Sequence, residues 1–147
     1  MTYQEITQDL FKVPDHYHLA HCISADFALG KGIAVLFNQH FNMRSILKNK
    51  YPHFLEEWDD NPVKGTCIQE NKVFNLITKR NYWDKPTYKS ITNALISMKA
   101  LAITKHIHHI AMPLIGCGLD RLQWDKVSQI IKDTFAETDI DILICKQ

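Results

Sequence analysis

The stretch HLAHCISADFALGKGIAVLFNQHF, residues 18–41, decides the fold. Residues 18–24 form a short apolar run, and a loop that contains Gly30 and Gly32 follows it. Over residues 33–41 the apolar side chains recur at helical spacing. The stretch therefore predicts a strand, a glycine loop and a helix, in that order.

The rest of the chain continues to alternate between strand and helix patterns. The expected elements are a helix near 43–51, a hairpin of strands at 65–68 and 72–78, a long helix from Thr87, a buried strand within 109–116, a helix around 127–135 and a last strand at 140–145. Residues 53–64 are acidic and contain a proline, so we expect a surface loop there. This alternation predicts an α/β fold whose sheet is mixed or parallel, with helices on both faces and ligands bound beyond the carboxyl ends of the strands.

Length and composition predict one globular domain over residues 1–147. The chain is 46% hydrophobic and 22% charged, and it has no apolar run near the roughly 20 residues that cross a bilayer. The N-terminus lacks a secretory pattern and the four cysteines are scattered, so we expect an intracellular protein, cytoplasmic or, in a eukaryote, nuclear, with reduced thiols. We also expect a monomer. A formal net charge of +1 provides no field for non-specific binding of nucleic acid.

Two glycine loops are the first candidates for a binding site. ALGKGIA at 28–34 and PLIGCGLDRLQW at 113–124 both follow a predicted strand and precede a predicted helix. Such loops bring backbone N–H groups close to an anion, although each alone is also compatible with a simple tight turn. Two of them could hold the two phosphates of one diphosphate. The first loop matches neither a P-loop nor a complete GxGxxG, which disfavours a nucleotide triphosphatase and a nicotinamide dehydrogenase.

Two charged residues are candidates for chemistry. Lys79 ends the strand pattern VFNLIT and precedes Arg80, where a lysine is usually solvated but, when partly withdrawn from water, can act as a nucleophile. Asp120 lies in the second glycine loop, where it could equally satisfy N–H groups at the start of a helix. The residues alone leave both alternatives open.

Histidines and aromatic residues add weaker signals. His106, His108 and His109 have no usual zinc-ligand spacing and no cysteine pair beside them, so we expect no metal. Tyr82 and Trp83 follow Lys79 closely and are either core residues or an exposed surface that stacks a base or closes a cleft.

In combination, these features resemble the macrodomain family, and within it the terminal ADP-ribose protein glycohydrolases. The resemblance runs nearly the length of the chain and rests on QDLF (8–11), AHCIS (20–24), GKGIAVLF (30–37), LITKR (76–80), KPTY (85–88) and MPLIGCGLDRLQW (112–124). The chain departs from the family pattern at Gln8, where glycine is usual, and at Leu114, which is often arginine.

The resemblance implies a three-layer α/β/α macrodomain sandwich with a central mixed sheet, and it implies roles for particular residues. Lys79 and Asp120 match the catalytic lysine and aspartate of the family. Asp9 and Leu10 would bind the adenine. The other implied ligand-binding residues are Ser24, Gly30, Gly32, Ile33, Ala34, Thr78, Pro113, Ile115, Gly116, Cys117, Gly118 and Leu119.

The implied activity is hydrolytic removal of mono-ADP-ribose from acidic side chains of proteins. The resemblance also implies deacetylation of O-acetyl-ADP-ribose. Lys79 would attack the anomeric carbon of the distal ribose and Asp120 would act as acid and base, with no metal and no cofactor. Three alternatives stay open: removal of ADP-ribose from nucleic acid, binding of ADP-ribose without turnover, and a phosphatase acting on ADP-ribose 1″-phosphate.

Overall fold

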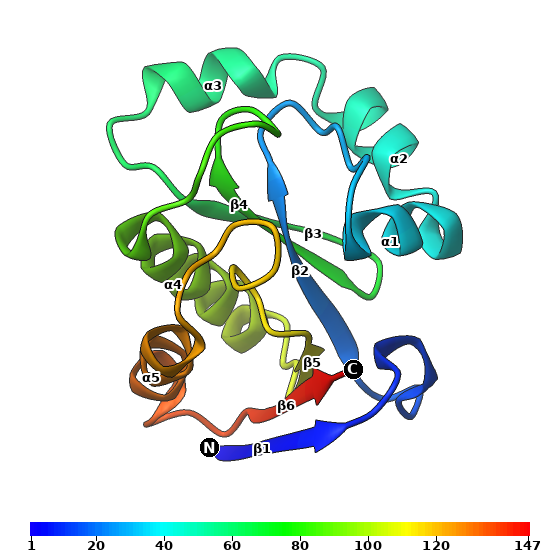
Figure 1. The fold of residues 1–147 in the computed structure, drawn as a ribbon, viewed down its shortest axis with the longest axis vertical. Coiled ribbons are helices and arrows are strands. Elements are labelled where there is room, and N and C mark those ends of the chain that lie inside the picture. Colours follow the sequence, from blue (N-terminus) through cyan, green and yellow to red (C-terminus); the bar gives the residue numbers. More distant parts are fainter.

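A six-stranded mixed sheet forms the centre of the structure, a computed structural model that describes residues 1–147 (Figure 1). The strands are β1 (Thr2–Thr7), β2 (His18–Ser24), β3 (Thr66–Glu70), β4 (Val73–Lys79), β5 (His109–Met112) and β6 (Asp141–Lys146). Their order across the sheet is β1-β6-β5-β2-β4-β3. All neighbours are parallel except β3 and β4, which form the antiparallel hairpin that the sequence predicts.

Helices cover both faces of this sheet. One face carries α1 (Ile33–Phe41), α2 (Met43–Lys50), α3 (Phe54–Asp60) and the short 3₁₀ helix η1 (Leu10–Lys12), and the other carries α4 (Tyr88–Thr104) and α5 (Trp124–Phe135) (Figure 1). The expected three-layer α/β/α sandwich is therefore confirmed. None of the helices combines the length and apolar character that a membrane span requires.

Strand β4 shows why the sheet needs cover on both sides. Its first six residues are all buried, as in strands at the centre of parallel sheets. Phe74 and Leu76 pack in the core beneath α4 and α5, whereas Val73 and Ile77 pack beneath α1 to α3. Successive side chains point to opposite faces of a strand, so a continuous apolar run supplies both cores.

Helix α4 begins where the sequence predicts, because Thr87 caps it. The Thr87 hydroxyl accepts a hydrogen bond from the Ser90 amide at 2.9 Å, and the Ser90 hydroxyl accepts one from the Thr87 amide at 3.0 Å. This reciprocal capping box satisfies two N–H groups that the first helical turn leaves without partners. The capped end of α4 lies immediately after the loop that follows β4.

Two elements differ from the sequence-based expectation. Residues 53–64, expected as a surface loop, contain α3, whose Phe54 and Trp58 are buried one helical turn apart. The sequence pattern also did not predict β1, an outer strand that pairs with β6 alone and has no buried residue. In both cases tertiary packing stabilises a segment whose own pattern is weak.

Candidate active site

A cleft of about 1440 Å³ opens beyond the carboxyl ends of the central strands. Three loops enclose it: residues 25–32 after β2, 80–86 after β4 and 113–123 after β5. Ligands of α/β sheets bind in this position, because the loops there converge from neighbouring parallel strands. The cleft exceeds the usual 300–1000 Å³ of small-molecule sites, so it has room for a ligand the size of a dinucleotide.

The first glycine loop has a fixed and strained backbone. Phe27 and Leu29 adopt positive φ angles of 53° and 44°, and their buried side chains anchor this conformation in the core. Asp26 accepts hydrogen bonds from the Ala28 amide at 3.1 Å and from the Ser24 hydroxyl. Helix α1 then begins after Gly32 with no side chain capping its first N–H groups, which are therefore available to an anion.

The second glycine loop turns tightly against α4. Gly116 has a φ of +73°, and a Cβ atom there would lie only 2.6 Å from Cδ1 of the buried Ile91. The Leu122 amide closes the turn by donating to the Gly116 carbonyl at 2.8 Å. Glycine is therefore required at position 116, both for the backbone conformation and for the close approach to the core.

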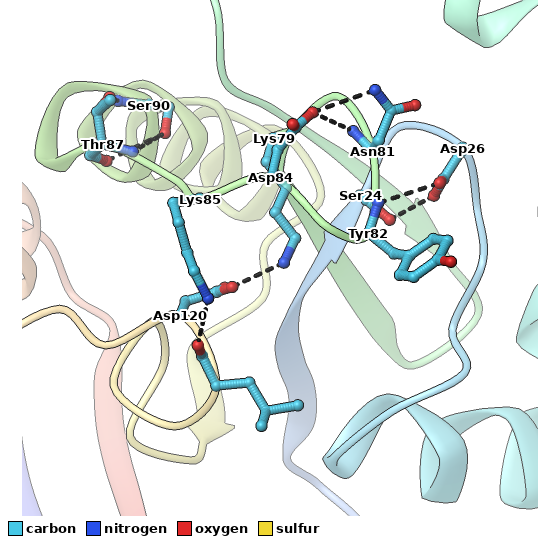
Figure 2. Close-up of polar contacts among 11 residues, drawn as sticks. Ser24, Asp26, Lys79, Asn81, Tyr82, Asp84, Lys85, Thr87, Ser90 and Asp120 are labelled. Atoms are coloured by element: carbon cyan, nitrogen blue, oxygen red, sulfur yellow. Dashed lines mark hydrogen bonds and ion pairs between the residues drawn. The ribbon is translucent and has the colours of Figure 1, made fainter.

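Lys79 and Asp120 meet in the cleft. Lys79 Nζ donates to Asp120 Oδ1 at 2.7 Å, and the two side chains are only 13% and 14% exposed (Figure 2). The solvated alternative for Lys79 is therefore wrong. The helix-start alternative for Asp120 is also wrong, because α5 begins at Trp124 with Gln123 at its N-cap.

A register shift in the sheet sets the position of Lys79. Ile23 of β2 pairs with Ile77, but the next residue, Ser24, pairs with Lys79, so Thr78 is passed over. Irregularities of this kind redirect the side chains that follow them. Lys79 consequently enters the cleft opposite Ser24, whereas Thr78 is buried with 3% exposure and does not line it.

Hydrogen bonds from the loop after β4 tie the three loops together. The Tyr82 amide donates to Asp26 Oδ2 at 3.1 Å, and Lys85 Nζ donates to the Leu119 carbonyl at 2.8 Å (Figure 2). Neither Asp26 nor Lys85 is among the site residues predicted from the sequence. For Asp26 a signal existed, since an aspartate directly after a strand commonly bonds backbone amides two residues further on.

Most of the ligand-binding residues implied by the resemblance lie on the cleft wall. They are Ser24, Gly30, Gly32, Ile33, Ala34, Pro113, Ile115, Gly116, Cys117, Gly118 and Leu119. The cleft also reaches Cys145 and Gln147, which the sequence analysis did not include.

Three of the implied residues, Asp9, Leu10 and Thr78, are not on the wall. Leu10 is fully buried, and the Asp9 carboxylate caps η1 by accepting from the Phe11 amide at 2.9 Å. Burial and, to a smaller extent, the Asp9 carboxylate raise the pKa of the Cys145 thiol to about 11. Asp9 follows β1, in which Ile6 pairs with Cys145 of β6, so Asp9 lies near the end of the cleft that Cys145 lines.

The cysteines of the cleft are not good nucleophiles. Burial raises the pKa of Cys22, and the nearby Asp120 carboxylate adds to this effect. Burial likewise raises the pKa of Cys117 to about 11, and its thiol donates to the Ile115 carbonyl. Both thiols are protonated at neutral pH and are therefore weak nucleophiles.

The histidines are distributed away from this pair. No three His, Cys, Asp or Glu side chains converge in a way that could hold a metal ion. His21 is fully buried, stacks on Phe37 and lies 2.7 Å from the Asn75 side-chain oxygen. Burial lowers its pKa to about 4, so it is a neutral residue of the core.

Comparisons with known proteins agree with this geometry. The Macro domain family model matches residues 26–131. The human protein ADP-ribose glycohydrolase OARD1 is 39% identical over 136 residues, which are 92% of this chain and 86% of that protein. The macrodomain of Mycobacterium tuberculosis DarG superposes with a TM-score of 0.80 at 20% identity, covering 98% of this chain and 97% of the other. Thermosipho africanus DarTG, solved in complex with ADP-ribose, superposes with a TM-score of 0.76 at 17% identity, covering 99% of this chain and 42% of that one.

Proposed function

This chain belongs to the macrodomain family, and from that premise we propose that it is an ADP-ribose-binding glycohydrolase that removes mono-ADP-ribose from acidic side chains of proteins. The observation that carries the proposal is the contact between Lys79 Nζ and Asp120 Oδ1, enclosed between two glycine loops. The name of the human relative supports hydrolysis of an ADP-ribose linkage. We extend the proposal to O-acetyl-ADP-ribose, which carries a similar ester.

The cleft suits a ligand with a central diphosphate. Backbone N–H groups without a partner in the protein lie on two sides of the cleft, at Ile33 and Ala34 of α1 and at Gly116 and Gly118 of the second glycine loop, as phosphate sites require. The distal ribose would then lie beside Lys79 and Asp120. The adenine would lie toward Cys145, next to Asp9.

The reaction begins with the amine of Lys79. Asp120 Oδ1 is within hydrogen-bond distance of Nζ and can accept the proton that the amine must lose. The Nζ electron pair forms a bond to the anomeric carbon, while the bond from that carbon to the acceptor oxygen breaks. The electron pair of the broken bond leaves with the acceptor carboxylate, which takes the proton back from Asp120, and the sugar stays bound to Lys79.

Water completes the cycle. Asp120 accepts a proton from the attacking water molecule, the bond between the sugar and Lys79 breaks, and the amine recovers a proton as it leaves. The products are the free carboxylic side chain and ADP-ribose. The low exposure of both side chains favours this route, because electrostatic interactions are stronger in a site with little water.

We propose that residues 1–147 act as one macrodomain and as a monomer. The outer strand β1 belongs to the same sheet as the strands that end at the cleft, and one chain supplies every residue of the site. The four free cysteines agree with an intracellular location. Size-exclusion chromatography with light scattering would test the monomer.

The test is hydrolysis of a protein that carries glutamate-linked mono-ADP-ribose. Wild type should release ADP-ribose, whereas Lys79→Ala and Asp120→Ala should each lower kcat by a factor of roughly 10² to 10⁴. Intact-protein mass spectrometry of Asp120→Ala should show an ADP-ribose adduct that is absent when Lys79 is also replaced. Lys48→Ala, which replaces an exposed lysine of α2 that does not line the cleft, is the matched control and should behave as wild type.

Two results would contradict the proposal. One is tight binding of ADP-ribose by wild type without any release from the modified protein, which would indicate a protein that binds ADP-ribose without turnover. The other is full activity of Lys79→Ala, which would exclude the covalent route.

A further inference from the structure

The mouth of the cleft carries exposed apolar side chains. Tyr82 is 51% exposed, Trp83 65% and Leu119 60%, and all three line the cleft together with the exposed Leu36. Single exposed apolar residues are ordinary on protein surfaces, but several gathered around one opening indicate a contact with a ligand or partner. Two of these residues, Tyr82 and Trp83, are adjacent in the chain and form what we call the aromatic rim.

The aromatic rim is held in place by its backbone. The Tyr82 amide donates to Asp26 at 3.1 Å, and the Asn81 amide donates to Asp84 at 3.0 Å (Figure 2). The two rings contact each other edge to face, with centroids 4.9 Å apart and planes at 87°. Rigid aromatic rings bind a partner with little loss of side-chain entropy, so this arrangement suits recognition.

The aromatic rim lies on the acceptor side of the proposed reaction. Trp83 follows Lys79 by four residues, in the loop that leaves the strand carrying the nucleophile. The acceptor is attached to the carbon that Lys79 would attack, so the body of the acceptor must leave the cleft past the loops around this pair. On the opposite lip, Leu119 adjoins Asp120, and Lys85 ties the Leu119 carbonyl to the loop that carries the rim.

Building on the proposed function, we propose that Tyr82 and Trp83 bind the acceptor polypeptide by packing against an apolar or aromatic side chain next to the modified carboxylate. Tyr82, Trp83 and Leu119 all line the cleft and are exposed, so they supply apolar surface for such a side chain. They thus determine which modified proteins the enzyme accepts.

The charges around the rim favour a polypeptide over a nucleic acid. Proteins that bind single strands by stacking also provide a basic groove that follows the phosphates. Here the Arg80 guanidinium is engaged by both carboxylate oxygens of Asp59, at 2.7 and 2.8 Å, and is not available for a phosphate. Lys31 lies over the Tyr82 ring at 5.8 Å from its centroid, and Lys85 is bonded to a carbonyl. Lys31 and Arg121 are the cations of the cleft wall without a hydrogen-bonding or ion-pair partner, and two such residues are fewer than a groove along a phosphate backbone requires.

The test compares two substrates that differ only in the acceptor on the anomeric carbon, so the acetyl ester is used as its 1″-O-acetyl form. O-acetyl-ADP-ribose has almost no acceptor body, whereas a glutamate-linked ADP-ribosyl peptide with an apolar neighbour has one. Trp83→Ala should lower the ratio of kcat/KM for the peptide to kcat/KM for the acetyl ester by about tenfold, mainly through KM. Tyr82→Ala should act in the same direction. Ile96→Ala, which removes an exposed apolar side chain from α4, should leave the ratio unchanged.

Binding measurements separate this inference from the proposed function. In a Lys79→Ala background, Trp83→Ala should weaken binding of the ADP-ribosyl peptide about tenfold more than binding of free ADP-ribose, whether or not wild type turns over. An unchanged ratio of the two affinities would overturn the inference. A selective loss for an ADP-ribosylated oligonucleotide, with none for the peptide, would also overturn it. Absence of turnover by wild type on both substrates would instead contradict the proposed function.

Discussion

Replacing Gly116 by alanine should destabilise the protein and disturb the second glycine loop. The backbone at this position has a φ of +73°, a conformation that costs an alanine roughly 1–2 kcal/mol. The added Cβ would also lie 2.6 Å from Cδ1 of Ile91 and 3.2 Å from Cδ1 of Leu122. Ile91 is 1% exposed in the core beneath α4, so it has little room to move, and overpacking there costs about 1–3 kcal/mol.

The two costs together predict a loss of roughly 2–5 kcal/mol in the free energy of unfolding. Gly118 provides the control, since a Cβ there meets no atom within 4 Å. Gly118→Ala should change the free energy of unfolding by less than about 0.5 kcal/mol. Urea denaturation measures both variants against wild type at neutral pH.

The affinity for ADP-ribose tests whether the loop that contains Gly116 takes part in ligand binding. Calorimetry on folded Gly116→Ala should show an affinity at least about tenfold below that of wild type, because the loop must move away from α4 to admit the Cβ atom. Equal free energies of unfolding for Gly116→Ala and Gly118→Ala would refute the reasoning. An unchanged affinity in a clearly destabilised Gly116→Ala protein would refute the role of this loop in binding.

Three further predictions follow from single residues. The buried His21 has a folded pKa of about 4 against about 6.5 when unfolded, so the unfolded state takes up more protons between these values and stability falls as pH drops, by about 2 kcal/mol at pH 5. Urea denaturation at pH 7.5 and 5 measures this loss, and an equal loss in His21→Gln would contradict its assignment to His21. Thr87→Ala should cost about 1 kcal/mol by removing the cap of α4, and Thr87→Ser should restore most of it in thermal unfolding. Asp26→Ala frees the Tyr82 amide and should lower the affinity for ADP-ribose in calorimetry; an affinity equal to that of wild type would show that the loops hold their positions without this carboxylate.

The strand, loop and helix at residues 18–41 could be predicted from the sequence because their signals are local. The helix predicted at residues 33–41 is confirmed as α1, and Thr87 caps α4 as expected. Apolar periodicity and capping depend on residues a few positions apart, so both can be recognised in the sequence before the fold is known. The seven residues of α3 were too few and too acidic to stand out, although Phe54 and Trp58 already have the spacing of one helical face.

The contact between Lys79 and Asp120 could not be predicted from the sequence, because only the tertiary structure brings the two residues together. The sequence identifies both as candidates through their positions after predicted strands, but each alone had an ordinary alternative. They meet because parallel strands end at one edge of the sheet, and because the register between β2 and β4 shifts so that Lys79 lies opposite Ser24. That shift depends on packing across the whole sheet.

Around Lys79 and Asp120, too, some features could be predicted from the sequence and others depend on the tertiary structure. The sequence by itself determined the fold class, the two glycine loops and the residue types that the chemistry needs. Only the tertiary structure decided that Thr78 is buried outside the cleft and that Asp59 forms an ion pair with Arg80. It also decided that Tyr82 and Trp83 are exposed at the mouth of the cleft. The physical reason is distance along the chain: periodicity and turn chemistry act between near neighbours, whereas strand register, ion pairing and exposure depend on groups that only folding brings together.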